Sequence, residues 1–313
     1  MRPQILTRQD FTRYLPQFIE LYGNCFSGPI NEQYFIWRYF ECGKDLLISI
    51  IIDKGKVVSF YAASPWQLVN KNETTKSAVA LNTMTHPDYS GRGLFPMLAR
   101  YLYNYMRTLG YEQVILFPNH LSNKTATKKL GAQTIYEIPS LELNVEEYIV
   151  ENIDLLPTDN EFDLIYEDAR FLREGRAHVL KDSGYLRWRY YQNPMNEYIN
   201  FVINNNGKAD GYVVCKEYED KLNIVDIGFL NIIQADNLIY NAIVYAKKTH
   251  KKYATIWAPI NTEFHLLLES MKFKNNYPIQ YFSIVHLSDE DSFKELNHYN
   301  NWFVQLGDNC SVY

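Results

Sequence analysis

A short aromatic and basic segment occurs twice in the chain, and this repeat restricts the fold more than any other feature. It reads YFIWRY at residues 34–39 and YLRWRY at residues 185–190. Internal repetition is typical of a duplicated structural unit. Because aromatic side chains bury large apolar areas, we interpret both copies as packing elements and not as parts of an active site.

The same order of predicted elements follows each copy. Two β-rich runs flank a glycine-containing turn, which predicts a hairpin in each half. The runs lie at residues 46–52 and 57–63 in the first half and at residues 198–203 and 209–215 in the second. Later, a strand reaches Pro and Asn at residues 114–119 and again at 255–261, and a short helix follows each time. The order predicts a duplicated α/β unit; chance recurrence of one hexapeptide is the alternative.

Size and charge limit the classes of protein. The chain has 313 residues, of which 47% are hydrophobic and 15% aromatic, and at about 100–200 residues per domain this suggests two domains. We place them at residues 1–150 and 151–313, meeting near 145–165. The net charge of −5 argues against nucleic acid or an anionic membrane as partner. Without an apolar run of about 20 residues or a signal peptide, the expected location is the cytoplasm.

The cysteines and histidines do not predict a metal site. The four cysteines lie at positions 25, 42, 215 and 310, without a C-x-x-C pair or a histidine at ligand spacing. We therefore expect free thiols, mostly acting as small buried apolar groups.

The stretch from Val79 to Gly110 carries the strongest functional signal. Residues 79–85 are typical of a strand, which ends at Pro87 because proline cannot continue a central ladder. From Leu94 onward, apolar residues recur every three or four positions, which predicts a helix. The glycine loop, which we define as residues 90–93 (SGRG), joins the two.

A glycine loop at a helix start favours anion binding. The first N–H groups of a helix have no internal acceptor, and the helix dipole places partial positive charge beside them. The glycines let a phosphate approach the backbone, and an arginine adds charge, although glycines also serve ordinary turns. The sequence thus predicts a diphosphate site. Its candidate residues are Ser90, Gly91, Arg92, Gly93, Leu94 and Phe95.

This stretch resembles a known family. HPDYSGRGLFPML, with the later QVILFPN and KKLGA, is similar to the acetyl-coenzyme A-binding core of the GNAT N-acetyltransferase superfamily, whose pattern is Arg/Gln-x-x-Gly-x-Gly/Ala. Gly93 matches the central glycine, whereas Ser90 and Phe95 stand at the other two marked positions. The resemblance implies a tandem GNAT fold of class α/β (α+β), with two mixed-sheet halves flanked by helices.

The second half resembles the same fold in degenerate form, because no glycine loop follows its strand near residues 224–227. The resemblance therefore implies one coenzyme A site, with the second half contributing to the acceptor site. The whole pattern, including NWFVQLGDN near the end, resembles tandem GNAT enzymes of bacterial surface-polysaccharide synthesis (O-antigen, lipopolysaccharide). Those enzymes acylate nucleotide-linked amino sugars. The implied substrates are acetyl- or 3-hydroxybutanoyl-CoA and a dTDP-linked amino sugar.

The resemblance also implies roles for residues near the predicted strand end. Thr83 and Thr85 would pair with the pantetheine arm between two parted strands, and the backbone N–H of Met84 would stabilise the oxyanion. Asn119 would hydrogen-bond pantetheine or sugar, or alternatively cap a helix.

The group that deprotonates the amine has three candidates. His86 follows the strand, and Asp226 and Asp308 would face the cleft between the halves. Many superfamily members have a tyrosine after the fifth strand that protonates the departing thiolate. Residues 123–130 hold none, so another residue would serve or the thiolate would leave unassisted.

Two rival functions remain open. One is a GNAT acetyltransferase acting on another amine, such as a peptide, polyamine or antibiotic. The other is a non-catalytic acyl-CoA-binding or scaffold protein.

Overall fold

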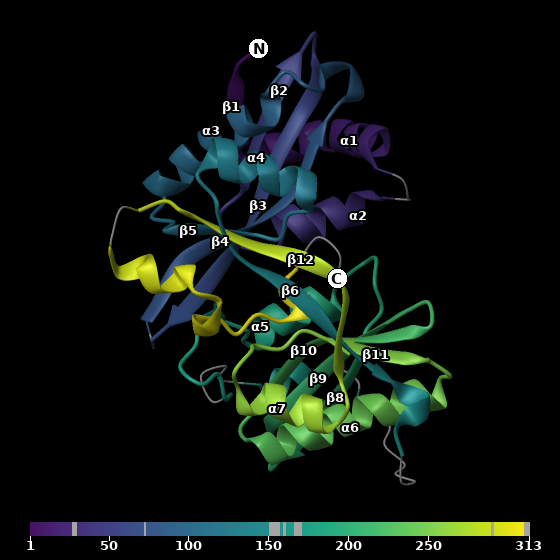
Figure 1. The fold of residues 1–313 in the computed structure, drawn as a ribbon. Helices are drawn as coiled ribbons and strands as arrows, with labels where there is room; N and C mark the ends of the chain where they lie inside the picture. Colours follow the sequence, from purple (N-terminus) through teal and green to yellow (C-terminus); the bar gives the residue numbers. More distant parts are fainter. Residues whose placement is uncertain are drawn as a thin grey trace. The chain divides into compact units, whose positions relative to one another are not determined.

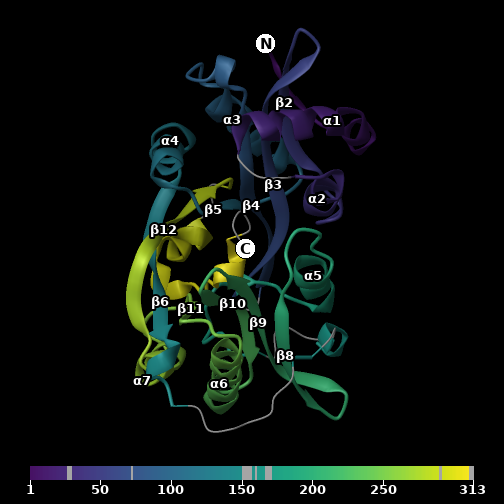
Figure 2. The ribbon, with the colours of Figure 1, turned by 90° about the vertical axis from the view of Figure 1, so that its right-hand side faces the viewer.

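The computed structural model describes most of the chain, and its residues form two compact units (Figures 1 and 2). The described ranges are 1–26, 30–71, 73–149, 157–158, 161–165, 171–288 and 291–309. Unit 1 comprises Met1–Leu68, Thr74–Tyr136 and Tyr281–Asn297, and unit 2 comprises Val69–Glu73, Glu137–Gln280 and His298–Tyr313. The expected boundary at residue 150 lies outside the described residues, so the two domain limits stay a prediction.

Unit 1 is a mixed sheet with helices on both faces. Its sheet order is β1-β2-β3-β4-β5-β12, in which β4 and β5 are parallel. Figure 2 shows α1 and α2 on one face of this sheet and α3 and α4 on the other. The elements are β1 (Pro3–Ile5), α1 (Arg8–Cys25), α2 (Glu32–Phe35), β2 (Leu47–Asp53), β3 (Lys56–Asn70), β4 (Glu73–Thr85), α3 (Leu94–Thr108), β5 (Gln113–Leu116), α4 (His120–Leu130) and β6 (Gln133–Asn144).

The helices of unit 1 form where the apolar periodicity places them. The predicted helix is confirmed as α3, whose buried stripe packs over β1 and β2. The stripe consists of Leu94, Leu98, Leu102 and Met106. On the opposite face α1 buries Phe18, whose ring meets the ring of Phe60 edge-on at 5.0 Å between centroids.

Unit 2 repeats this plan. Its order runs β6-β11-β10-β9-β8, with β10 and β11 parallel. Helix α6 packs on β9 and β10 through Leu238, Ile239 and Ala242. The elements are β7 (His178–Val179), α5 (Ser183–Leu186), β8 (Ile199–Asn205), β9 (Lys208–Tyr218), β10 (Lys221–Phe229), α6 (Ile232–Lys248), β11 (Tyr253–Ile256), α7 (Glu263–Ser270) and β12 (Lys274–His286).

The predicted duplication is confirmed in detail. The two copies of the repeated segment form short π-helices, η1 (Ile36–Phe40) and η6 (Arg187–Tyr191), and both central arginines are fully buried, as expected of packing elements. Both predicted hairpins form, and each has a register shift just before its turn. In both turns the two central residues have positive φ, at Lys54-Gly55 and at Asn206-Gly207.

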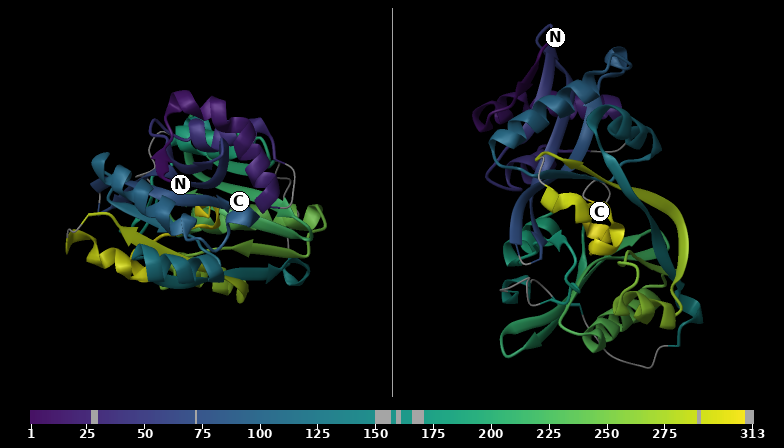
Figure 3. Two further views of the ribbon diagram at one scale, coloured as in Figure 1. Left: turned by 90° about the horizontal axis from the view of Figure 1, so that it is seen from above. Right: turned by 60° about the vertical axis from the view of Figure 1, so that its left-hand side comes forward.

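One feature of the strand order was not expected. The last strands of the two halves, β6 and β12, lie side by side (Figure 3), and each contributes residues to both units. Tyr281 to His286 of β12 thereby join unit 1, where Ser283 to His286 pair with β5.

The sequence predicts no membrane-spanning helix, no metal site and no disulfide. Within the described part of the chain, no helix has the length and apolar character needed to cross a membrane. In the same residues, no group of three or more His, Cys, Asp or Glu side chains is placed to hold a metal ion. Cys25, Cys42 and Cys215 are thiols and not disulfides, while Cys310 lies outside the described residues.

Candidate functional site

The glycine loop joins β4 to α3 in a conformation that requires glycine. Gly91 and Gly93 have φ of +75° and +73°, in the left-handed region where a side chain costs about 1–2 kcal/mol. An added Cβ at either position would meet no atom within 4 Å. The backbone conformation, and not crowding, therefore selects glycine, and the space over the loop is open to a ligand.

The start of α3 is left open. Its first intrahelical bond runs from Met97 N to Gly93 O at 3.3 Å, so the N–H groups of Leu94 and Phe95 have no acceptor inside the helix. No side chain caps this helix in the described structure. Side chains do cap the other long helices α1, α4, α6 and α7, and the capping residues are Thr7, Asn119, Asn231 and Thr262. Unpaired donors at a helix N-terminus suit a phosphate.

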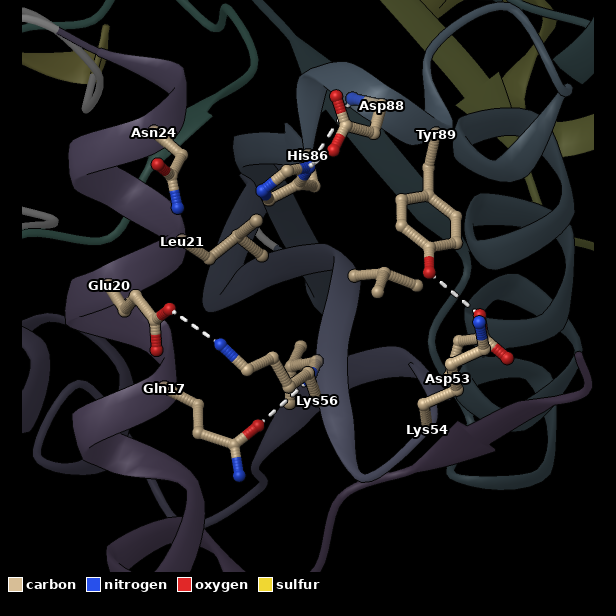
Figure 4. Close-up of a pocket in the computed structure, with 12 residues that line it drawn as sticks. Gln17, Glu20, Leu21, Asn24, Asp53, Lys54, Lys56, His86, Asp88 and Tyr89 are labelled. Carbon is tan, nitrogen blue, oxygen red and sulfur yellow. Dashed lines mark hydrogen bonds and ion pairs between the residues drawn. The ribbon is translucent and has the colours of Figure 1, made fainter.

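The side chain of Arg92, within the glycine loop, contacts the two residues that precede the loop. Its guanidinium donates to the carbonyl of Asp88 at 2.7 Å and lies 4.8 Å from the ring centroid of Tyr89. The Tyr89 hydroxyl in turn donates to the carboxylate of Asp53 at 2.7 Å (Figure 4). Its predicted role as extra positive charge for a phosphate stays a prediction.

The two parallel strands beside the loop separate, as expected. Their pairing ends at Val79 and Ile115, while β4 continues to Thr85. His86 N donates to Val58 O on β3 at 2.9 Å. Because an antiparallel ladder alternates, the N–H and C=O of the preceding Thr85 then face away from β3. Backbone groups at this end of β4 are thus available to a second extended chain.

The three predicted residues of β4 differ in environment. The side chains of Thr83 and Thr85 are partly exposed, whereas that of Met84 is fully buried. The carbonyl of Met84 accepts from Ser59 Oγ at 3.1 Å, and the carbonyl of Thr85 accepts from Cys25 Sγ at 3.4 Å. Their predicted contacts with pantetheine and oxyanion concern backbone atoms and stay predictions.

Asn119 follows β5 and acts as a helix cap, the alternative considered for it. Its Oδ1 accepts from Ser122 N at 2.9 Å at the start of α4. This leaves only the amide nitrogen for the predicted ligand contact.

A tyrosine that the sequence did not indicate lies beside the start of α4. The Tyr281 hydroxyl is 3.4 Å from Nδ1 of His120. The expected position of such a tyrosine is residues 123–130, which follow β5, whereas Tyr281 enters unit 1 from β12.

A pocket of about 390 Å³ adjoins the glycine loop, between α1, the β2–β3 turn and the end of β4 (Figure 4). Its charged side chains are mixed in sign. They are Glu20, Asp53, Asp88, Lys54 and Lys56. His86 also lines it, and its Nδ1 accepts from Asp88 N at 3.3 Å. In the neutral ring the proton is therefore on Nε2, which Figure 4 shows turned toward α1. In this tautomer His86 offers the pocket a donor.

Asp226 and Asp308 lie together in unit 2, away from solvent. Their side chains are 0% and 3% exposed, and both contact the ammonium of Lys181, at 2.9 and 2.8 Å. The hydroxyls of Tyr190 and Tyr212 also donate to Asp226. Burial raises the pKa of Asp308, which Lys181 opposes. We expected both carboxylates to face a cleft. In the structure both are instead buried and paired with Lys181. Their role as base stays a prediction.

The C-terminal segment, which we define as residues 301–309, fills the place in unit 2 that corresponds to the open edge of β4. The pairing of β10 with β11 ends at Ile224, as that of β4 ends at Val79. Beyond it, the amide of Gln305 donates to Ile227 O at 2.7 Å and accepts from Ile227 N at 3.2 Å. Asn231 also caps α6, so in the described residues neither this edge of β10 nor the start of α6 is left open. This supports the prediction of one coenzyme site.

Replacing Gly307 with alanine is expected to destabilise the protein by about 1–3 kcal/mol, because this segment has no room for a side chain. The new Cβ would lie 2.1 Å from the Tyr190 hydroxyl and 2.9 Å from Val225 O. Thermal unfolding measures the effect. The control is Gly23→Ala in α1, where a Cβ meets nothing within 4 Å; equal melting temperatures for both variants would contradict the close packing.

Comparisons with known proteins agree with this geometry. Residues 9–135 match the family described as acetyltransferase (GNAT) domain. No curated protein sequence matches the chain. Among solved structures, a probable N-acyltransferase of unknown function from Enterococcus faecalis is similar with a TM-score of 0.69 at 13% identity, covering 91% of this chain and 72% of that one.

Two further structures share the fold. A GCN5-related N-acetyltransferase from Anabaena variabilis gives a TM-score of 0.65 at 12% identity, covering 92% of this chain and 73% of that one. The N-myristoyltransferase of Saccharomyces cerevisiae, solved with bound myristoyl-CoA, gives 0.59 at 10% identity, with 91% and 79% covered. The chain therefore has the fold of these structures, its residues 9–135 match an acetyltransferase (GNAT) domain, and together these findings support an acyl-CoA-dependent N-acyltransferase.

Proposed function

We propose that the protein transfers an acyl group from acyl-CoA to the amino group of a nucleotide-linked amino sugar in surface-polysaccharide synthesis. The observation that carries the acyl-CoA half is the open start of α3 beside the unpaired edge of β4. The amino-sugar half is supported by the resemblance of the whole-chain pattern to tandem GNAT enzymes of that pathway class. Acetyl and 3-hydroxybutanoyl are the proposed acyl groups.

The glycine loop and the β4 edge would position the thioester. The N–H groups of Leu94 and Phe95 would bind the diphosphate, and the backbone of Thr83 and Thr85 would pair with the pantetheine arm. The N–H of Met84, predicted for the oxyanion, faces β3 by the alternation of the ladder. The N–H of Thr85 on the open side of β4 is therefore proposed to stabilise the negative charge that develops on the thioester oxygen when the amine attacks. Holding both reactants in line lowers the entropic part of the barrier.

Proton transfer needs a base for the amine and an acid for the thiolate. His86, Asp226 and Asp308 are the proposed candidates for the base; in the tautomer that the Asp88 N–H favours, His86 instead donates from Nε2 and orients the acceptor. For the acid we propose Tyr281, whose hydroxyl lies beside the start of α4.

The pocket beside the glycine loop does not favour a polycationic acceptor. Its three carboxylates are accompanied by two lysines and a histidine, and Lys56 is already paired with Glu20 at 3.2 Å. A polyamine site would instead require an excess of carboxylates.

A thioester-consumption assay tests the function. The full chain is incubated with acetyl- or 3-hydroxybutanoyl-CoA and with dTDP- and UDP-linked amino sugars, and released thiol is measured. We expect turnover with at least one amino sugar and a roughly 100- to 10,000-fold lower kcat for Tyr281→Phe, as for loss of a general acid. Turnover only with a peptide or polyamine supports the rival transferase, and coenzyme A binding without any turnover supports a binding protein.

A further inference from the structure

Unit 2 contains a second pocket, of about 580 Å³, with an excess of positive charge. Four of its lining side chains are basic or can be protonated, and one is acidic. The four are Lys71, Arg173, Arg176 and His178, and the acid is Glu174. The chain as a whole carries a net charge of −5, so the local excess is opposite in sign to the protein.

A tight turn holds the two arginines. Arg176 N donates to Arg173 O at 3.0 Å, and the two residues between them, Glu174 and Gly175, have φ of +52° and +68°. Positive φ at both central positions is typical of a type I′ turn, which brings the backbones of its first and last residues together. The backbones of Arg173 and Arg176 therefore lie next to each other, and both residues line the pocket.

Neighbouring contacts fix this turn. Ala177 N donates to Asn301 O at 2.7 Å, and Phe303 N donates to Ala177 O at 2.8 Å. Arg173 lies over the ring of Phe303, 4.8 Å from its centroid. The turn is thus tied to the buried C-terminal segment, and its arginines are already ordered before a ligand binds.

The charge of Arg176 is not offset by a carboxylate among the described residues. Its guanidinium donates to the backbone carbonyls of Asn300 and of Asn261, the latter at 3.1 Å. Nδ1 of His178 donates to the carbonyl of Arg176 at 2.8 Å. Backbone carbonyls orient an arginine without neutralising it, so Arg176 keeps its attraction for an anion.

We propose that this pocket binds the diphosphate of a nucleoside diphosphate. Two adjacent arginines match the several oxygens of a diphosphate, and the volume lies within the ordinary range of small-molecule sites. The nucleoside diphosphate is the non-reacting part of the acceptor only if the proposed function holds; the anion site itself does not rest on that function. Coenzyme A also carries phosphate esters, so the test separates the two sources.

Calorimetry with the full chain tests the site, with dTDP as probe and thymidine and inorganic pyrophosphate for comparison. We expect dTDP and pyrophosphate to bind, thymidine not to bind, and the affinity for dTDP to fall with added salt. Arg176→Gln should weaken dTDP binding about 10- to 100-fold, as expected for loss of charge-assisted hydrogen bonds. Lys71→Gln, at an exposed position, should weaken it less without affecting the fold.

Arg100→Gln is the matched control, because Arg100 of unit 1 also donates to a backbone carbonyl, that of Lys129 at 2.8 Å. It should leave dTDP binding unchanged. Unchanged dTDP affinity in both Arg176→Gln and Lys71→Gln, or displacement of dTDP by coenzyme A, would overturn the proposal. Binding of dTDP that depends on Arg176, without turnover of any amino sugar, would leave the pocket established and refute only the proposed function.

Discussion

Replacing Gly93 with glutamate is expected to abolish coenzyme A binding while the fold of unit 1 is kept. The new carboxylate would stand at the open start of α3, where the diphosphate is proposed to bind. At a separation of 4 Å, two like charges repel by about 4 kcal/mol near a protein surface, which corresponds to roughly a thousandfold loss of affinity. The left-handed φ of +73° adds about 1–2 kcal/mol of strain to the folded state.

Calorimetric titration with coenzyme A measures the effect, and two variants separate charge from strain. Gly110→Glu introduces the same charge at another left-handed glycine, with φ of +78°, just past the other end of α3; it should bind coenzyme A normally. Gly93→Asn introduces a residue that tolerates this conformation without a charge, and it should lose less affinity than Gly93→Glu. Undiminished binding by Gly93→Glu would remove the glycine loop from the proposed site.

Local patterns in the sequence predicted most of the fold. The glycine turns predicted both hairpins, and the three- and four-residue spacing from Leu94 predicted α3. The repeated segment predicted the duplication, because two copies of the same sequence form the same short π-helix. These features depend on neighbours within a few residues, which is the range over which periodicity and turn chemistry act.

The candidate site was predicted only in part, because some of its geometry depends on distant residues. The loop and the strand edge are local, whereas Tyr281 reaches α4 only because β12 adds its last residues to unit 1. No local sequence pattern indicates that a strand of the second half ends in the sheet of the first. Asp226 and Asp308 were expected, as candidate bases, to face the cleft between the halves. Their burial follows from Lys181, which is far from both in sequence.

The C-terminal segment illustrates the same limit. In the sequence this segment contributes only to a whole-chain resemblance, whereas in the structure it has a physical role. The side-chain amide of Gln305 makes the two hydrogen bonds to Ile227 that the backbone of a neighbouring strand would make. Ile227 lies beyond Ile224, where the pairing of β10 with β11 ends. In the described part of unit 2, Asn231 thus occupies the start of α6 and Gln305 occupies the edge of β10, the two places that correspond to the proposed coenzyme site of unit 1.

Replacing Lys181 with methionine is expected to destabilise the protein by about 3–5 kcal/mol, because it leaves two buried carboxylates without their cation. Lys181 is 3% exposed and pairs with both Asp226 and Asp308. Asp308 in turn accepts a hydrogen bond from Gln305 N at 2.8 Å in the C-terminal segment. Methionine keeps much of the apolar volume, so the expected loss comes mainly from charge. Thermal or urea unfolding at pH 7 measures it.

The pH dependence and two controls distinguish charge from packing. The pKa of Asp308 is already raised by burial, and loss of Lys181 should raise it further. A raised carboxyl pKa destabilises the folded state only above the unfolded value of about 3.9, so the deficit of Lys181→Met should shrink as pH falls toward 4.

Lys252→Met, which removes an exposed pair with Asp220, should cost less than about 1 kcal/mol. Adding Asp226→Asn and Asp308→Asn to Lys181→Met should restore part of the stability. If the loss of stability persists unchanged in this triple variant and at every pH, the lysine acts by packing and not by charge.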